Sequence, residues 1–225
     1  MNTNVTLFGR IRKLLEAVDA EPIGGADAEF VTDQQLNLMV AQGAMPYATI
    51  NQAGRSFWTG TTAALAAVVA IPTTGNMLTI YNNNPDGGRS LIVDWVAASG
   101  VAKTAAAGQA QLLALIGQLR DTAPATAGFS IKKRNGYGGT LDTGVIPATA
   151  ALSAQTGVAA NWFPLGPAVG FPGAAATPGH GLYARLDGDI IVPPGRVFAM
   201  HVLADVVGST FLGFIGWHEK MIALA

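Results

Sequence analysis

The pattern of apolar and polar positions divides the chain near residue 50. Between Val5 and Asp19, apolar side chains recur every three or four positions, which places them on one face of a helix. These residues are Phe8, Ile11, Leu15 and Val18. The sequence Glu-Pro-Ile-Gly-Gly at residues 21–25 then ends the predicted helix. We therefore expect residues 1–50 to form an N-terminal amphipathic helical arm.

Two interpretations of this arm remain open. In the first, the helix packs on its own domain. In the second, its apolar face docks on another subunit of an assembly, and Phe8, Ile11, Leu15 and Val18 are the assembly contacts.

From Ser56 onward the pattern indicates β-strands, and we expect residues 51–225 to form one β-sandwich domain. Residues 77–81 and 91–96 read as strands because they are apolar and rich in β-branched side chains. Between them lies Asn-Asn-Asn-Pro-Asp-Gly-Gly, a sequence typical of a tight polar turn.

The C-terminal part is read as three strands of one sheet, at residues 189–192, 196–207 and 210–224. The strands are apolar enough to be buried on both faces or against another subunit. Residues 109–120 fit either a short helix or a buried strand, and their surroundings favour the strand. Residues 135–178 are predicted to form extended loops in which Trp162 and other aromatic side chains pack.

Composition adds that the surface is poor in charge. Half of the 225 residues are apolar, yet only 12% are charged, against about 25% in an ordinary soluble domain. The formal net charge is -1 and the mean hydropathy is +0.35. We therefore expect neighbouring subunits to cover much of the surface, as in a homo-oligomer such as a trimer.

The chain also lacks the sequence features of membrane, secreted and disulfide-bonded proteins. Its longest apolar stretch, residues 63–71, is too short to cross a bilayer, and basic residues near the start interrupt any signal peptide. We expect no membrane span and synthesis in the cytoplasm. The absence of cysteine excludes disulfides and thiolate metal sites.

Three histidines are the candidates for acid-base or metal chemistry. If the strands that carry His201 and His218 pair, the two imidazoles approach each other, and Asp205 or Glu219 completes a metal site. The alternative is that both are half-buried structural histidines bonded to backbone carbonyls. His180, between two glycines, is expected in a loop.

Other motifs favour structure over chemistry. The basic run at residues 132–134, flanked by Phe129 and Tyr137, fits nucleic acid only superficially, because no wider basic field surrounds it. Asp-Gly-Asp at residues 187–189 reads as a turn before a strand rather than a calcium loop. No nucleophile elbow or phosphate-binding loop is present. We predict a protein that is not an enzyme, with no catalytic, metal or cofactor-binding residue.

Several stretches, taken in order, resemble the β-sandwich virion proteins of tailed bacteriophages. They are residues 82–89 with the strand after them, Gly-Gly-Thr-Leu at 138–141, residues 190–198 around Pro-Pro-Gly, and Phe-Ile-Gly-Trp-His-Glu at 214–219. The resemblance implies a jelly-roll-like antiparallel sandwich in a capsid decoration, connector, or tail or fibre component. It also implies localisation in the virion and partners among copies of the chain and other virion proteins.

Two rival functions stay open. One is a binding module for a host carbohydrate or receptor, with Tyr137, Trp162 and Tyr183 presented on loops. The other is a cupin-type metal enzyme that uses His201, His218 and Glu219.

Overall fold

The computed structural model describes residues 54–72, 77–102, 107–117, 129–135, 143–148, 162–171 and 181–222. The chain divides into two compact units, Met1–Ala53 and Gly54–Ala225, and every described residue belongs to the second. The predicted helical arm, with its contacts Phe8, Ile11, Leu15 and Val18, lies outside the described residues. No helix in the described part of the chain is long and apolar enough to cross a membrane.

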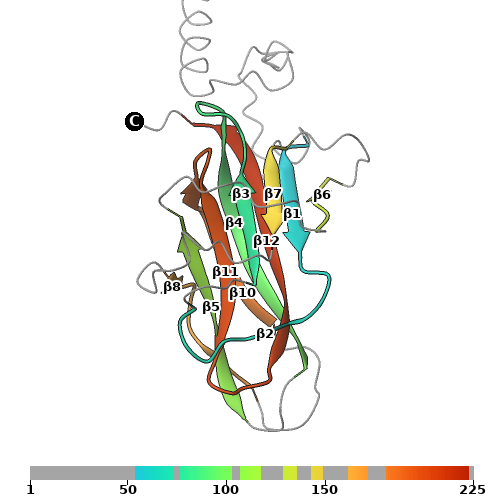
Figure 1. Ribbon diagram of the computed structural model, residues 1–225, viewed down its shortest axis with the longest axis vertical. Coiled ribbons are helices and arrows are strands. Elements are labelled where there is room, and N and C mark those ends of the chain that lie inside the picture. Colours follow the sequence, from blue (N-terminus) through green and yellow to red (C-terminus); the bar gives the residue numbers. More distant parts are fainter. Residues whose placement is uncertain are drawn as a thin grey trace, which may run out of the picture. The chain divides into compact units, whose positions relative to one another are not determined.

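The second unit is a sandwich of two antiparallel β-sheets (Figure 1). The first sheet has the order β10-β4-β12-β1-β6, and β2 also pairs with β12. Its strands are β1 (Ser56–Gly60), β2 (Leu65–Ala66), β4 (Arg89–Ala102), β6 (Lys132–Lys133), β10 (Gly181–Val192) and β12 (Thr210–Met221). The mainly β sandwich expected from the sequence is confirmed.

The second sheet has the order β7-β3-β11-β5-β8, and β9 also pairs with β5. Its strands are β3 (Leu78–Asn82), β5 (Gly108–Ile116), β7 (Val145–Ala148), β8 (Trp162–Pro164), β9 (Val169–Phe171) and β11 (Val197–Ala204). The strand preferred for residues 109–120 is thus confirmed up to Ile116.

The core lies between the two sheets because alternate side chains of each strand point inward. Phe57, Ile215 and Trp217 project from the first sheet and are fully buried, as are Phe198 and Met200 from the second. Gly213 of β12 faces two methionines and leaves little room for a side chain. A Cβ atom at Gly213 would lie 3.1 Å from the Sδ atom of Met77 and 3.2 Å from that of Met200.

The polar turn after β3 connects the two sheets instead of closing a hairpin, since β3 and β4 lie in different sheets. Asn82, which is fully buried, donates from Nδ2 to the carbonyl oxygens of Arg89 and Val192, each at 2.9 Å. Its Oδ1 accepts from the backbone and side-chain nitrogens of Asn84 at 3.2 and 2.9 Å. One side chain therefore joins β3 of the second sheet to β4 and β10 of the first.

The expectation that the three C-terminal strands form one sheet is wrong. β10 and β12 belong to the first sheet and β11 to the second, so the chain crosses the sandwich at each of the two turns. The Pro-Pro-Gly turn makes the first crossing, with Gly195 at φ 71° and its N–H donated to the Asn82 carbonyl at 2.7 Å. A turn of this kind places consecutive strands in opposite sheets, so they do not pair with each other.

Two smaller expectations are corrected as well. Asp187 and Gly188 adopt positive φ angles of 45° and 97° and form a bulge inside β10, not a turn before it. The segment expected as loops contains the short strands β7, β8 and β9. Their three or four residues are too few to show a period in the sequence.

Candidate functional site

The histidines do not form a joint metal site. His201 lies on β11 in the second sheet and His218 on β12 in the first, and both point to the outer faces because Val202 and Trp217 beside them point into the core. No group of three metal-ligating side chains occurs among the described residues. The expected pairing of the two strands fails because the intervening turn crosses the sandwich.

His218 belongs to a buried polar network on the first sheet. Its Nδ1 lies 2.7 Å from Oδ1 of Asp94, and Oδ2 of Asp94 accepts from Nη1 of Arg134 at 3.2 Å. The same Arg134 nitrogen lies 3.4 Å from Oγ of Ser56, the residue directly opposite His218 on β1. Asp94 is the extra residue of a β-bulge, which turns its carboxylate outward toward His218.

This network resembles a serine-histidine-aspartate arrangement only in composition. Ser56, Asp94 and His218 are 2%, 3% and 5% exposed, so no substrate atom reaches them in this conformation. The serine hydroxyl accepts from the Arg134 guanidinium, which cannot act as a base. The arrangement fits a structural lock between β1, β4, β12 and the segment after β6.

His201 is a buried structural histidine on the opposite face. The N–H of Val202 donates to its Nδ1 at 2.8 Å, and the ring meets Trp162 edge to face at a centroid distance of 6.4 Å. Burial lowers the pKa of His201, although the carbonyl of Val202 opposes the shift. Glu219, the third residue of the cupin-type hypothesis, accepts from Thr143 and lies 4.0 Å from Arg89, so the three do not converge.

A row of aromatic side chains crosses the outer face of the first sheet. Tyr183 of β10 stacks on Trp95 of β4 at 6.4 Å between ring centroids, with an interplanar angle of 24°. Farther across the sheet, Phe214 of β12 lies 6.4 Å from Trp58 of β1. Tyr183 is 64% exposed and the other three rings are half-buried, so the row is accessible. We call these four residues the aromatic row.

Two glycines allow these rings to lie close to the sheet. Strand pairing sets Trp58 opposite Gly216 and Gly60 opposite Phe214. A Cβ atom at Gly216 would lie 2.2 Å from the indole of Trp95, and one at Gly60 would lie 2.4 Å from the ring of Phe214. Both contacts are far below van der Waals distance, so each ring occupies the space above a glycine.

The ends of the aromatic row carry charge. At the β6 end, Nζ of Lys132 lies 5.3 Å from the centre of the Trp58 ring, a cation-π contact. At the β10 end, Arg185 pairs with Asp187 at 2.7 Å. Thus Lys132 contacts an aromatic ring, whereas Arg185 forms an ion pair with a carboxylate.

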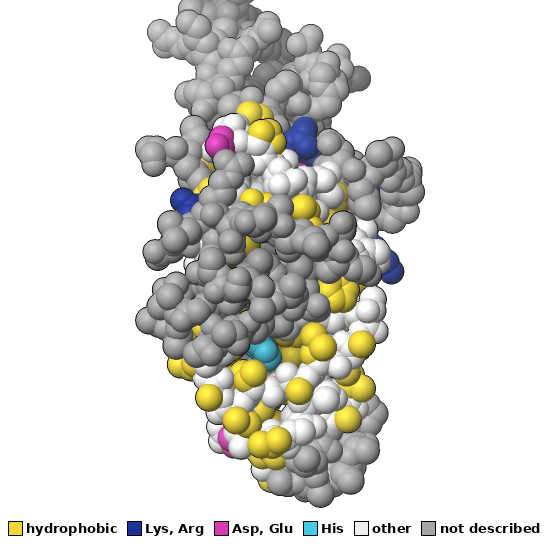
Figure 2. Space-filling view, viewed as in Figure 1, with side chains coloured by type: hydrophobic (Ala, Val, Ile, Leu, Met, Phe, Trp, Pro, Cys, Tyr) yellow, Lys and Arg dark blue, Asp and Glu magenta, His cyan; other side chains and the backbone are white. Residues whose placement is uncertain are grey.

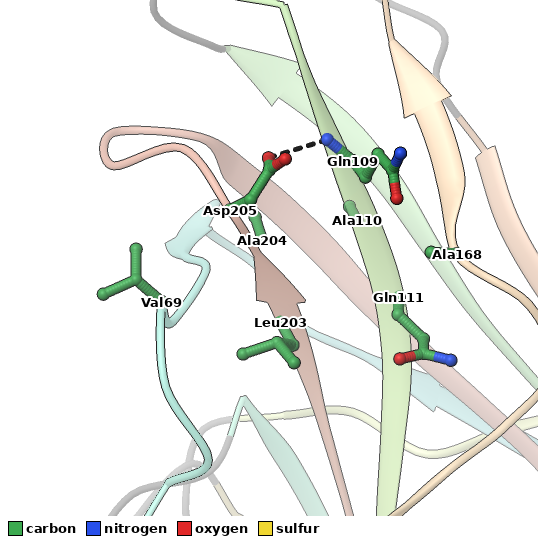
Figure 3. A pocket seen from close by; sticks show the side chains of 8 residues that line it. All are labelled: Val69, Gln109, Ala110, Gln111, Ala168, Leu203, Ala204 and Asp205. Atoms are coloured by element: carbon green, nitrogen blue, oxygen red, sulfur yellow. Dashed lines mark hydrogen bonds between the residues drawn. The ribbon is translucent and has the colours of Figure 1, made fainter.

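The opposite face of the sandwich carries a shallow pocket with little charge. Figure 3 shows Val69, Leu203 and the glutamines 109 and 111 around it, with Asp205 at one end. The carboxylate of Asp205 is engaged, because its Oδ1 accepts from the backbone N–H of Gln109 at 2.7 Å. The Val69 side chain is 56% exposed.

Charge is scarce well beyond this pocket. Across residues 56–72, 95–102, 107–117, 162–171 and 197–218, Asp205 is the single Asp, Glu, Lys or Arg. In Figure 2, lysine and arginine side chains appear only in the upper half of the described surface, and below them hydrophobic side chains are interspersed with uncharged ones. Large exposed apolar residues include Val69, Ile71, Val101, Val169 and Val207.

Comparison with protein-family models, curated proteins and solved structures finds no match to this chain. The similarity to phage virion proteins therefore rests on the short motifs of the sequence itself.

The sequence identified one of the four aromatic-row residues. Tyr183, which we expect on a loop, lies on strand β10. Trp162, also expected on a loop, is buried in β8 at 6% exposure. Tyr137 lies outside the described residues. The overlooked signal is an aromatic-x-glycine pattern at residues 58–60 and 214–216, two segments that pair antiparallel.

Proposed function

We propose that this protein is a structural subunit of a larger assembly, the virion of a tailed bacteriophage, and that it acts through contacts between copies of the chain. The scarcity of charge on the second sheet, whose described strands contain no Asp, Glu, Lys or Arg, carries this proposal. A domain alone in solution usually has roughly 25–35% charged residues on its surface, which keep it soluble. Sheet faces with almost none are stabilised when a neighbour covers them.

The contact surface is the pocket face of the second sheet with the adjoining turn. Val69 and Val207 are 56% and 72% exposed there, and Gln109 and Gln111 supply neutral donors and acceptors. Two copies of such a surface can meet without charge repulsion, and the contact buries the apolar surface of their valines. A closed homo-oligomer, such as a trimer, covers the same surface on every copy.

The strand order supports the virion interpretation and its jelly-roll architecture. Eight strands form two four-strand rows, β1-β12-β4-β10 and β3-β11-β5-β8. Numbered in chain order, the rows read 1-8-3-6 and 2-7-4-5, which is the double Greek key of a jelly roll. Viral capsid and lectin domains are among the proteins that use this architecture. The proposal covers three positions in the phage particle: capsid decoration, connector, and tail or fibre component.

The mass of the purified full chain in solution, measured by light scattering, tests the assembly. We expect a multiple of the 23.1 kDa chain mass. Val69→Lys should shift the protein toward the single-chain mass, because it buries an unpaired charge in the contact. Asn83→Lys adds the same charge on the exposed β3–β4 turn and should leave the mass unchanged.

A wild-type protein with the single-chain mass at every concentration would overturn the proposed self-assembly. The virion itself is tested separately, by mass spectrometry of purified particles from a phage that encodes the chain. Absence of the protein from such particles would reject the virion and leave the oligomer intact.

A further inference from the structure

We propose that the aromatic row on the outer face of the first sheet binds a glycan that carries carboxylated sugars, such as sialic or uronic acids. The sugar rings would stack on Tyr183, Trp95, Phe214 and Trp58, with a carboxylate near Lys132. This site lies on the face opposite the shallow pocket and does not depend on the proposed assembly.

Ring chemistry favours a glycan. Aromatic faces offer a flat apolar surface with little conformational freedom, which suits the apolar C–H faces of pyranose rings. The row runs from β1 to β10, which are three strand spacings or about 14 Å apart, and Lys132 lies one strand farther on, in β6. That distance fits several linked sugars rather than a single one.

The structure also holds the rings in place before any ligand binds. The indole of Trp95 lies over Gly216, and the Phe214 ring lies over Gly60. Because neither glycine has a side chain, both rings can lie flat against the sheet. Trp95 is further fixed by its stacking on Tyr183. A surface that is ordered beforehand loses less entropy on binding.

Charge on this face favours an anionic ligand. Asp94 is bonded to His218 and Arg134, and Asp187 is bonded to Arg185, so both of these carboxylates already have cationic or imidazole partners. Asp189, which is also exposed on β10, lies at the end of the sheet opposite to β6 and Lys132. Lys132 is exposed and contacts the Trp58 ring. An ammonium at the end of an aromatic surface matches a ligand with apolar faces and a negative group.

Another occupant fits less well. Single-stranded nucleic acid also stacks on aromatic rings, but it needs a groove with many cations, and the chain has a net charge of -1.

The test uses the full-length protein and a panel of immobilised oligosaccharides that contain sialic or uronic acid. Each is paired with the same oligosaccharide after reduction of its carboxyl groups, and a single-stranded DNA oligonucleotide is included. We expect binding to at least one acidic oligosaccharide and weaker binding to its reduced partner. Preferential binding of the DNA, or no binding to any oligosaccharide, would overturn the proposal.

Variants locate the site. Tyr183→Ala should weaken binding about tenfold or more, whereas Tyr183→Phe keeps the ring and should bind like the wild type. Gly216→Ala should weaken binding by displacing the Trp95 indole. Lys132→Ala should remove the preference for the acidic oligosaccharide and leave binding to the reduced one.

Circular dichroism of each variant establishes that the sandwich is intact, and Tyr183 is exposed enough for its replacement to be tolerated. Unchanged glycan binding by Tyr183→Ala would reject the site. If Tyr183→Ala instead lowers the oligomeric mass and no glycan binds, the face is a contact between copies and the proposal is wrong. Failure of Val69→Lys to change the mass affects only the assembly proposal.

Discussion

Nδ2 of Asn82 lies 2.9 Å from the carbonyl oxygen of Val192, and this hydrogen bond joins the two sheets of the sandwich. A second bond from the same nitrogen reaches the carbonyl of Arg89. The amide geometry is used fully, since Nδ2 donates twice and Oδ1 accepts twice. A carboxylate of the same shape cannot replace it.

Asn82→Asp is therefore expected to destabilise the protein by about 3 kcal/mol or more. The substitution removes two donors and sets a negative charge against two carbonyl oxygens in a buried place. Denaturant unfolding of the variant measures the change. Asn83→Asp, at the exposed neighbouring position, is the control and should change the free energy of unfolding by no more than about 0.5 kcal/mol.

Asp94→Ala should cost about 3 kcal/mol, because it leaves Arg134 and His218 without their shared acceptor in a buried network. Asp94→Asn keeps an acceptor oxygen and should cost less. Asp189→Ala removes an exposed carboxylate from the same sheet and serves as the control. Equal stability of Asp94→Ala and Asp189→Ala would show that the network contributes nothing.

The free energy of unfolding should fall as the pH drops below the ordinary histidine pKa of 6.5, in part because of His201. Burial lowers the pKa of His201 in the folded protein, so the unfolded chain binds a proton first as the pH falls. The His201 contribution is complete above pH 6.5 and is lost as the pH falls toward the folded pKa. His201→Asn should reduce the slope of stability against pH between pH 5 and 7; an unchanged slope would contradict the assignment.

Gly195→Ala should destabilise the sandwich by about 1 kcal/mol or more, because an L-side chain is strained at the φ of 71° that the β10–β11 turn requires. Gly170 provides a matched comparison, since a Cβ atom at this position would meet no other atom within 4 Å and its φ is not positive. Gly170→Ala should be close to neutral in thermal unfolding.

Removal of residues 1–25 should leave the sandwich folded, because the described strands and core all lie in the unit Gly54–Ala225. If the arm docks on a neighbour, the truncated protein should be incorporated less efficiently into the assembly. Loss of the β-sheet circular dichroism signal on truncation would contradict the independence of the two units.

The sequence was informative where local chemistry decides the structure. The Asn-Pro-Asp-Gly turn, the Pro-Pro-Gly turn and the apolar strands around them follow from residues close together in the chain. Which sheet each strand joins does not, because it depends on Asn82 and on turns that cross the sandwich. Hence the pairing of the strands of His201 and His218 was predicted and is wrong.

The aromatic row was largely missed for a related reason. Its rings come from four strands, the first and last of which are more than a hundred residues apart in sequence, and they meet only through strand pairing. The bulge at Asp94 also shifts the alternation of β4, so that Trp95 faces outward beside it. A regular period of two does not anticipate that shift.

The bulge at Asp187 and Gly188 has a consequence for how the protein behaves at high concentration. β10 is 12 residues long and, among the described strands, pairs only with β4, which leaves the far side of its backbone as an edge. A straight edge of that length would be a template for fibre growth by strand addition. The kink, together with the charges of Arg185, Asp187 and Asp189, interrupts the edge after its first few residues. Strand addition between copies at this edge is thereby disfavoured.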